Sequence, residues 1–120
     1  MGKISVYLDE EHQIIRQNFD GNLDEDMVQR FLEESRAAAA RLKDPKKIRI
    51  LGVADSLGKG SPEARRQLLR NLDHDDVYKV ALLGKNPFMN VAISFFLAIK
   101  PSNKIRMFGN EDDALRWLME

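Results

Sequence analysis

The pattern of apolar and polar residues in the first third of the chain predicts a hairpin followed by a helix. Apolar residues alternate with polar ones over Lys3–Leu8, which indicates a half-buried strand. A charged turn, Asp9–Glu11, separates it from a second predicted strand at His12–Phe19, and so short a connection makes the pair antiparallel. Apolar residues at helical spacing then predict a helix that begins after an N-cap at Asp24 and ends near Leu42.

The rest of the chain alternates predicted strands with predicted helices. The apolar stretch Ile48–Val53 predicts a buried strand, and a polar, glycine-containing loop, Ala54–Gly60, follows it. A helix begins at Ser61-Pro62, because serine caps a helix and proline fits its first turn. The later elements are a strand at Val77–Leu83, a helix from Asn86-Pro87 to about Ile99 or Lys100, a strand at Ile105–Phe108 and a helix capped by Asn110.

The resulting order, β-β-α-β-α-β-α-β-α, defines the expected fold. In the second half of this order strands alternate with helices, and such an arrangement requires parallel strands joined by right-handed crossovers. We therefore expect one α/β domain over residues 1–120. It contains a mixed five-stranded sheet, antiparallel in the first hairpin and parallel in the remainder, and four helices. A chain of 120 residues suits a single core.

Composition narrows the class of protein without specifying an activity. The formal net charge is zero, so no overall field favours nucleic acid, and no nucleic-acid partner is expected. The chain has no cysteine, which excludes disulfides, thiolate metal sites and cysteine nucleophiles and is compatible with a cytoplasmic location. The longest apolar run, Val91–Ile99, is far shorter than the ~20 residues that span a membrane, so no transmembrane segment is expected.

The sequence contains no recognisable catalytic signature. Gly58–Ser61 resembles part of a nucleotide-binding P-loop, but Gly60 stands where a hydroxyl residue must follow Lys59. The two histidines, His12 and His74, lack the spacing to carboxylates that a metal site or a catalytic triad needs. The sequence therefore predicts a protein that is not an enzyme and that holds neither a metal nor another cofactor.

Polar residues follow the parallel strands at the edge of the sheet where their carboxyl ends should meet. Three helix N-termini would point to this rim, which suits an anionic group or a charged side chain of a partner. The candidate rim residues are Asp55, Ser56, Lys59, Ser61, Lys85, Asn86 and Asn110. A simpler interpretation stays open, in which Asp55 and Ser56 form a polar turn that bonds its own backbone and Ser61 only caps a helix.

The predicted third helix, between Pro87 and Lys100, carries few polar residues. Only Asn90 and Ser94 are polar, and they lie on one stripe, whereas a helix on a small sheet normally keeps a wide polar face. Burial between the sheet and a neighbouring helix would explain this pattern. Otherwise the helix exposes an apolar patch that serves a homodimer, a protein partner or an apolar ligand. The residues of that surface are Phe88, Met89, Val91, Phe95 and Phe96.

Three stretches carry a resemblance to a known family. They are Gly58–Arg66 (GKGSPEARR), Lys79–Phe96 (KVALLGKNPFMNVAISFF) and Lys104–Leu118 (KIRMFGNEDDALRWL). Together with the element order, they resemble the SpoIIAA-like branch of the STAS family, named for bacterial anti-sigma-factor antagonists, over nearly the whole chain. The resemblance implies a sheet with helices packed on it, an architecture shared with CRAL-TRIO lipid-carrier domains, and a role in binding other proteins.

The same resemblance implies a phosphorylation switch. Some STAS domains are switched at a serine at the start of the second helix, in a motif that resembles D-S-[ST]-G. Here Asp55-Ser56-Leu57-Gly58 matches the aspartate, one serine and the glycine, whereas Leu57 replaces the second hydroxyl. Ser56 is therefore the candidate phosphoacceptor, although the strong helix start falls later, at Ser61-Pro62.

Two functions are expected on these grounds. The first is a non-enzymatic, cytoplasmic protein-interaction or regulatory module that contacts a protein partner, or a second copy of itself, through the rim and the apolar third helix. The alternative is a carrier or sensor of a small apolar or lipid-like ligand, held in a cavity beneath the third helix.

Overall fold

The computed structural model describes residues 3–21, 24–57, 62–72, 76–84, 94, 98 and 103–120. The elements are β1 (Lys3–Asp9), β2 (Ile14–Gly21), α1 (Glu25–Ala39), β3 (Ile48–Leu57), α2 (Pro62–Leu72), β4 (Val77–Leu83), β5 (Ile105–Phe108) and α4 (Glu111–Leu118). Three helices rather than four lie within these ranges. Of the expected third helix only Ser94 and Ala98 are described, both helical and exposed, so that prediction lies outside the described residues.

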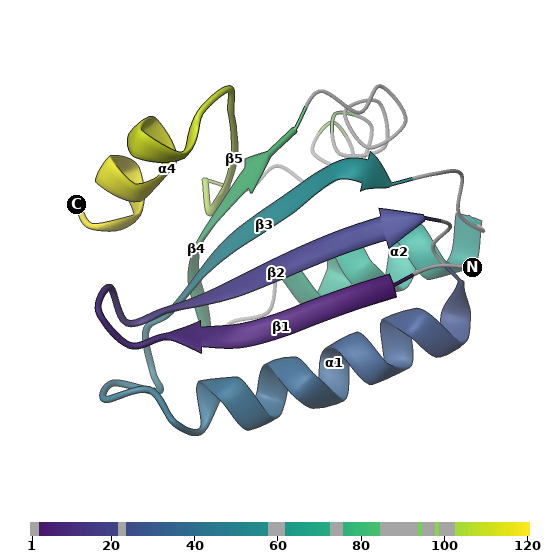
Figure 1. Cartoon of the computed structure of the whole chain (residues 1–120), viewed down its shortest axis with the longest axis horizontal. Coiled ribbons are helices and arrows are strands. Elements are labelled where there is room, and N and C mark those ends of the chain that lie inside the picture. The colour runs from purple at the N-terminus through teal and green to yellow at the C-terminus, as the bar shows by residue number, and fades with distance from the viewer. Residues whose placement is uncertain are drawn as a thin grey trace.

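The five strands form one mixed sheet in the order β1-β2-β3-β4-β5 (Figure 1). The β1 and β2 strands pair antiparallel, and every later pair is parallel. The α/β class, the antiparallel first hairpin and the parallel remainder that the sequence predicted are therefore confirmed.

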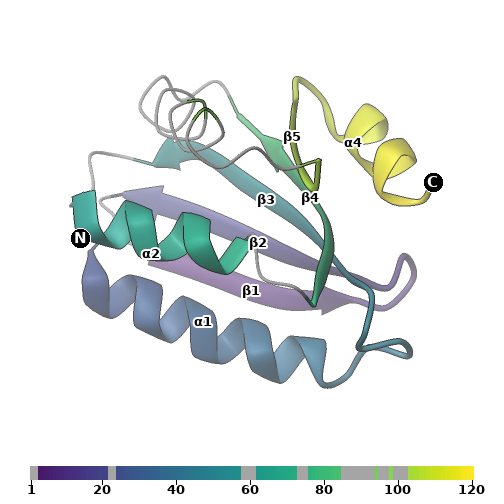
Figure 2. The same ribbon diagram turned by 180° about the vertical axis from the view of Figure 1, so that it is seen from behind.

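Helices cover both faces of this sheet. Views from opposite sides place α1 and α2 on one face and α4 over part of the other (Figures 1 and 2). The alternation of side chains in a strand explains the division: Ile15 and Ile50 pack under α1 and α2, while Ile14 and Leu51 pack under α4. α4 packs mainly on β3, β4 and β5, and Tyr7 of β1 is 48% exposed.

The larger part of the core lies under α1 and α2. Phe19 of β2 and Phe31 of α1 are both buried, with ring centroids 5.0 Å apart, and they fix the helix against the sheet. A smaller apolar cluster holds α4, where Ala114 and Leu118 are fully buried and Leu115 is half-buried. Leu115 and Leu118 therefore face the core.

Side-chain caps determine where two of the helices begin. Oδ1 of Asp24 accepts a hydrogen bond from the backbone N–H of Met27 at 2.7 Å, as the sequence predicted. At α4, Oδ1 of Asn110 accepts one from the backbone N–H of Asp113 at 2.9 Å. The second helix begins at Pro62, in agreement with the expected start at Ser61-Pro62.

The prediction of a loop over Ala54–Gly60 is wrong for residues 54–57, because β3 continues to Leu57. Its neighbour β2 also runs on past Phe19, and the pairs Asp20↔Ser56 and Gly21↔Leu57 extend the ladder beyond an irregularity in register after Asn18. Polar residues such as Asp55 and Ser56 usually favour turns, but backbone pairing with an adjacent strand has overridden that preference here.

Two other boundaries differ from the predictions. The turn between β1 and β2 spans residues 10–13, so His12 lies in the turn, and Gln13 takes a positive φ of 55°. The first helix ends at Ala39 rather than near Leu42, because the backbone N–H groups of Arg41 and Leu42 bond three residues back, to Ala38 and Ala39. Tightening of this kind is common in the last turn of a helix.

Candidate functional site

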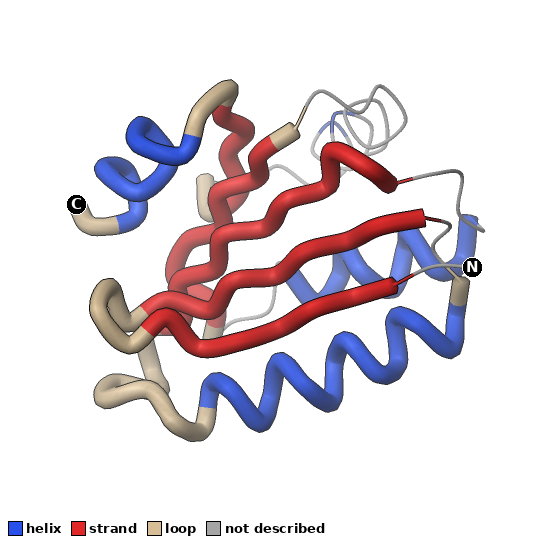
Figure 3. Tube along the Cα trace, viewed as in Figure 1, coloured by secondary structure: helices blue, strands red, loops and turns tan. Residues whose placement is uncertain are grey.

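Three parallel strands run to one edge of the sheet. Val53, Leu83 and Phe108 occupy the same register position on β3, β4 and β5. The β4 and β5 strands end there, whereas β3 continues beside β2 to Leu57. The segments after these strands therefore leave from one rim, which Figure 3 shows at the ends of the strands. This arrangement is the one from which we expected the rim residues to gather.

The structure describes only part of that expected set. Asp55 and Ser56 lie in the last residues of β3, where the backbone of Ser56 pairs with Asp20. The side chains of Asp55 and Ser56 lie outside what is described, and so do the residues Lys59, Ser61, Lys85 and Asn86. The carboxamide of Asn110 is exposed but engaged, since its oxygen caps α4 and its Nδ2 donates to Oδ2 of Asp113 at 2.9 Å.

The expected apolar surface lies outside the described residues as well. It comprises Phe88, Met89, Val91, Phe95 and Phe96. The expected cavity beneath that helix consequently remains a prediction.

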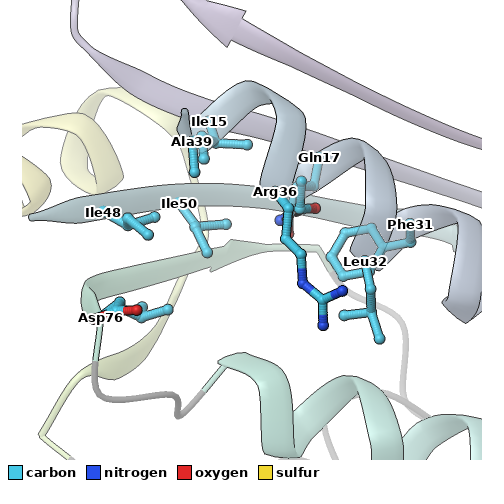
Figure 4. Close-up of a pocket in the computed structure, with 11 residues that line it drawn as sticks. Ile15, Gln17, Phe31, Leu32, Arg36, Ala39, Ile48, Ile50 and Asp76 are labelled. Carbon is cyan, nitrogen blue, oxygen red and sulfur yellow. Dashed lines mark hydrogen bonds between the residues drawn. The ribbon is translucent and has the colours of Figure 1, made fainter. Parts of the chain in front are cut away.

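A cavity that we did not expect lies between α1 and the sheet (Figure 4). Its volume is about 390 Å³, within the range of roughly 300–1,000 Å³ that is usual for small-molecule sites. Its walls come from α1, from the amino-terminal halves of β2 and β3, and from the start of β4. The apolar lining residues are Ile15, Phe31, Leu32, Ala39, Ile48, Ile50 and Val77, and the polar ones are Gln17, Ser35, Arg36 and Asp76.

Gln17 is the buried polar group of this cavity. Only 1% of the residue is exposed, and Nε2 of its carboxamide donates to Oγ of Ser35 at 3.3 Å. Oε1 is buried and has no hydrogen-bond partner among the described residues. A buried acceptor without a partner is unfavourable by about 1–3 kcal/mol, so this oxygen needs a donor that the described chain does not supply.

Arg36 lies at the opening of the same cavity. Figure 4 shows its side chain extending from α1 across the gap towards α2, beside Leu32. Arg36 is exposed, and none of the ion pairs found among the described residues includes its guanidinium. The site therefore combines an apolar wall, a buried acceptor and a cation at its opening.

The sequence analysis did not identify this site, although the alternation of residues in β2 marks Gln17 as a polar residue on a buried face. Ile15, Gln17 and Phe19 alternate along β2 and so share the face that meets α1. A polar residue between two apolar ones on the buried face of a strand is unusual and marks either an internal hydrogen bond or a ligand. The cavity itself has no comparable signal, because it depends on how the helices pack.

A second polar cluster ties the β1–β2 turn to the start of α4. Oδ1 of Asp9 accepts a hydrogen bond from the backbone N–H of His12 at 3.1 Å, and Oδ2 accepts one from Nε of Arg16 at 2.9 Å. Nδ1 of His12 also lies 3.0 Å from Oδ2. NH1 of Arg16 also pairs with Glu111. Burial alone would raise the pKa of Asp9, but the bonds from His12 and Arg16 outweigh it and lower the pKa to about 2. These contacts give the cluster a structural role.

Cations surround the aromatic residues at the other end of α4. Nζ of Lys79 lies 4.8 Å from the ring centroid of Trp117 and donates to the backbone carbonyl of that residue at 2.7 Å. Nε of Arg49 donates to the carbonyl of Leu118 at 2.8 Å. Because the last carbonyls of a helix lack partners within it, these bonds explain how α4 is held on the sheet.

Neither a metal site nor a membrane-spanning helix is found among the described residues. Across these ranges, no group of three or more histidine, cysteine, aspartate and glutamate residues is arranged to hold a metal ion. Within the same ranges, no helix is long and apolar enough to cross a membrane.

Comparisons with known proteins agree with the resemblance seen in the sequence. A family model described as SpoIIAA-like matches residues 14–119. A crystal structure of an uncharacterised protein from the DUF3478 family, with a SpoIIAA-like fold, from Shewanella loihica PV-4, superimposes with a TM-score of 0.74. The two chains are 19% identical, over 98% of this chain and 95% of the other, so this likeness concerns the fold. No curated protein matches in sequence.

Proposed function

This chain belongs to the SpoIIAA-like family, and we propose that it is a non-enzymatic, cytoplasmic protein-interaction module that contacts its partner at the carboxyl ends of its parallel strands. The observation that supports this proposal best is the shared register of Val53, Leu83 and Phe108, which brings the carboxyl ends of β4 and β5 to the edge where β3 runs on to Leu57. Loops that leave a sheet from one edge form a continuous surface on a rigid base, and such surfaces carry binding sites in α/β proteins.

Lys59 and Lys85 give this surface its expected charge. Each stands two positions after the last residue of a parallel strand, Lys59 after β3 and Lys85 after β4. Two lysines at adjacent strand ends favour a partner that presents acidic side chains, through attraction that weakens as the salt concentration rises.

Ser56 is proposed as the regulatory position of the same surface. It lies in β3, with its backbone paired to Asp20, and five residues separate it from the start of α2. A phosphate there would add negative charge beside Asp55 and oppose an acidic partner. Phosphorylation of Ser56 should therefore weaken the interaction, and Ser56→Asp should mimic it.

Capture of partners by tagged protein, followed by binding measurements with the purified partner, tests the proposal. Lys59→Glu and Lys85→Glu should each weaken binding, and Ser56→Asp should do the same. Lys46→Glu is the matched control, because Lys46 is exposed in the segment that leads into β3, at the opposite end of that strand. Equal binding by the wild type and all four variants would contradict the rim as the contact surface.

The apolar stretch that follows β4 is proposed as a second contact, used between two copies of the chain. Phe88, Phe95 and Phe96 would then pack against the same residues of a partner. Analytical ultracentrifugation tests this directly. A dimer that becomes a monomer in Phe95→Ser supports the contact. A wild-type chain that stays monomeric at high concentration contradicts it.

A further inference from the structure

We propose that the cavity between α1 and the sheet binds a small amphipathic acid that also carries a hydroxyl group. The hydroxyl donates to Oε1 of Gln17, the apolar body lies on the aliphatic wall, and the acid group pairs with Arg36 at the opening. This site is distinct from the rim, because it lies towards the amino ends of the strands, next to Ile48 and Val77.

The unpaired oxygen of Gln17 specifies the hydroxyl. Oε1 is an acceptor only, so its partner must be an O–H or N–H donor. In β3 the residue paired with Gln17 is Gly52, and a Cβ there would lie 4.0 Å from Oε1. The side chain of Leu82 fills the space over Gly52, since its Cδ2 would lie 2.9 Å from that Cβ, whereas Gln17 itself lines the cavity.

The apolar walls of the cavity favour a ligand with an apolar body. Ile15, Phe31, Ile50 and Val77 are each at least 94% buried, yet they border an open volume of about 390 Å³. Protein interiors are normally close-packed, with few voids larger than a water molecule. An apolar surface of this kind is better covered by an apolar ligand than by water.

Arg36 specifies the acid. It extends across the opening, where a ligand head group would meet it, and an arginine fork binds a carboxylate through two parallel hydrogen bonds. Asp76 lines the opposite part of the cavity, away from Arg36. Arg36 therefore orients the ligand, with its acid group towards α1.

Three eight-carbon probes separate these contributions in isothermal titration calorimetry with the full chain. They are 8-hydroxyoctanoate, octanoate, which lacks the hydroxyl, and 1,8-octanediol, which lacks the charge. We expect 8-hydroxyoctanoate to bind about tenfold more tightly than either of the others, since each lost hydrogen bond or ion pair weakens binding by about that factor.

Variants assign each preference to one residue. Gln17→Leu should abolish the preference for 8-hydroxyoctanoate over octanoate, and Arg36→Gln should abolish the preference over 1,8-octanediol. Arg30→Gln removes the same charge from an exposed position of α1 outside the cavity and should change neither. Because Arg36 is exposed, its variant remains informative even if Gln17→Leu fails to fold.

Three results would overturn the proposal. One is the absence of binding by all three probes. Another is a preference for the hydroxylated acid that survives in Gln17→Leu. The third is a high-resolution structure, obtained with 8-hydroxyoctanoate present, whose cavity holds only ordered water. None of these results bears on the rim, which is tested by partner binding and by different residues.

Discussion

At the scale of single residues, Gln17 shows how one position can weaken the fold while shaping a cavity. Its neighbours on the same face of β2, Ile15 and Phe19, are buried in the larger core. Gln17 is buried equally deeply but leaves Oε1 without a partner among the described residues. Burial of an unpaired polar atom is unfavourable, and residues that weaken a fold in this way are frequently kept for binding.

Replacement of Gln17 by leucine should therefore stabilise the protein. We expect Gln17→Leu to raise the free energy of unfolding by about 1 kcal/mol, because the unpaired amide is lost and a side chain of similar size replaces it. Urea denaturation followed by circular dichroism measures the change. Asn18→Leu, at the adjacent exposed position of β2, is the control and should stay within about 0.5 kcal/mol of the wild type. A loss of stability in Gln17→Leu would show that the carboxamide supports the fold.

Asp9 should make stability depend on pH in the acid range. Its pKa is about 2 in the folded protein against an ordinary value of 3.8. A lowered pKa stabilises the fold above pH 3.8, and this contribution is lost as the pH falls towards 2. At pH 7 we expect Asp9→Asn to lower the free energy of unfolding by roughly 2 kcal/mol.

The difference between wild type and Asp9→Asn should shrink as the pH is lowered from 5 to 2 in the same denaturation experiment. Glu10→Gln is the matched control in the same turn, because the pair between Glu10 and Arg41 is exposed and 3.5 Å long. A difference that stays constant down to pH 2 would mean that the carboxylate of Asp9 does not stabilise the fold through its charge.

At the scale of secondary structure, the sequence predicted the starts of the three described helices correctly and the end of β3 wrongly. The starts at Glu25, Pro62 and Glu111 follow from local chemistry, namely the caps Asp24 and Asn110 and the fixed φ of proline. The end of β3 is set by a partner strand, since Ser56 pairs with Asp20. Contacts between residues distant in the chain have no local signal.

Loss of the cap at Asn110 should weaken α4 measurably. We expect Asn110→Ala to lower the free energy of unfolding by about 1 kcal/mol, because the N–H of Asp113 loses its acceptor. Asn110→Ser should retain most of the stability, since serine also caps helices. Asp112→Ala, a substitution at an exposed position in the same turn, should change the free energy of unfolding by only a few tenths of a kcal/mol. Near-equal stabilities for Asn110→Ala and the wild type would leave Asn110 free for a role at the rim.

At the scale of the whole molecule, the rim and the cavity occupy opposite ends of the sheet. The rim lies where β3, β4 and β5 end, whereas the cavity is lined by Ile48 and Val77, the first residues of β3 and β4. Element order predicted this edge, because the carboxyl ends of parallel strands face the same edge of a sheet, and the rim residues placed there stay a prediction. The cavity could not be predicted, because it depends on how closely α1 approaches the sheet and on which side chains fill the space.

The central claim, that the rim is the contact surface, is tested most directly by site-specific photo-crosslinking in cells. A photoreactive amino acid is placed at position 59, at position 85 or, as the control, at position 46, each of which is a lysine in this chain. We predict that one and the same protein is crosslinked from positions 59 and 85 and not from position 46. Crosslinking of that protein from position 46 alone, or equally from all three positions, would contradict the account.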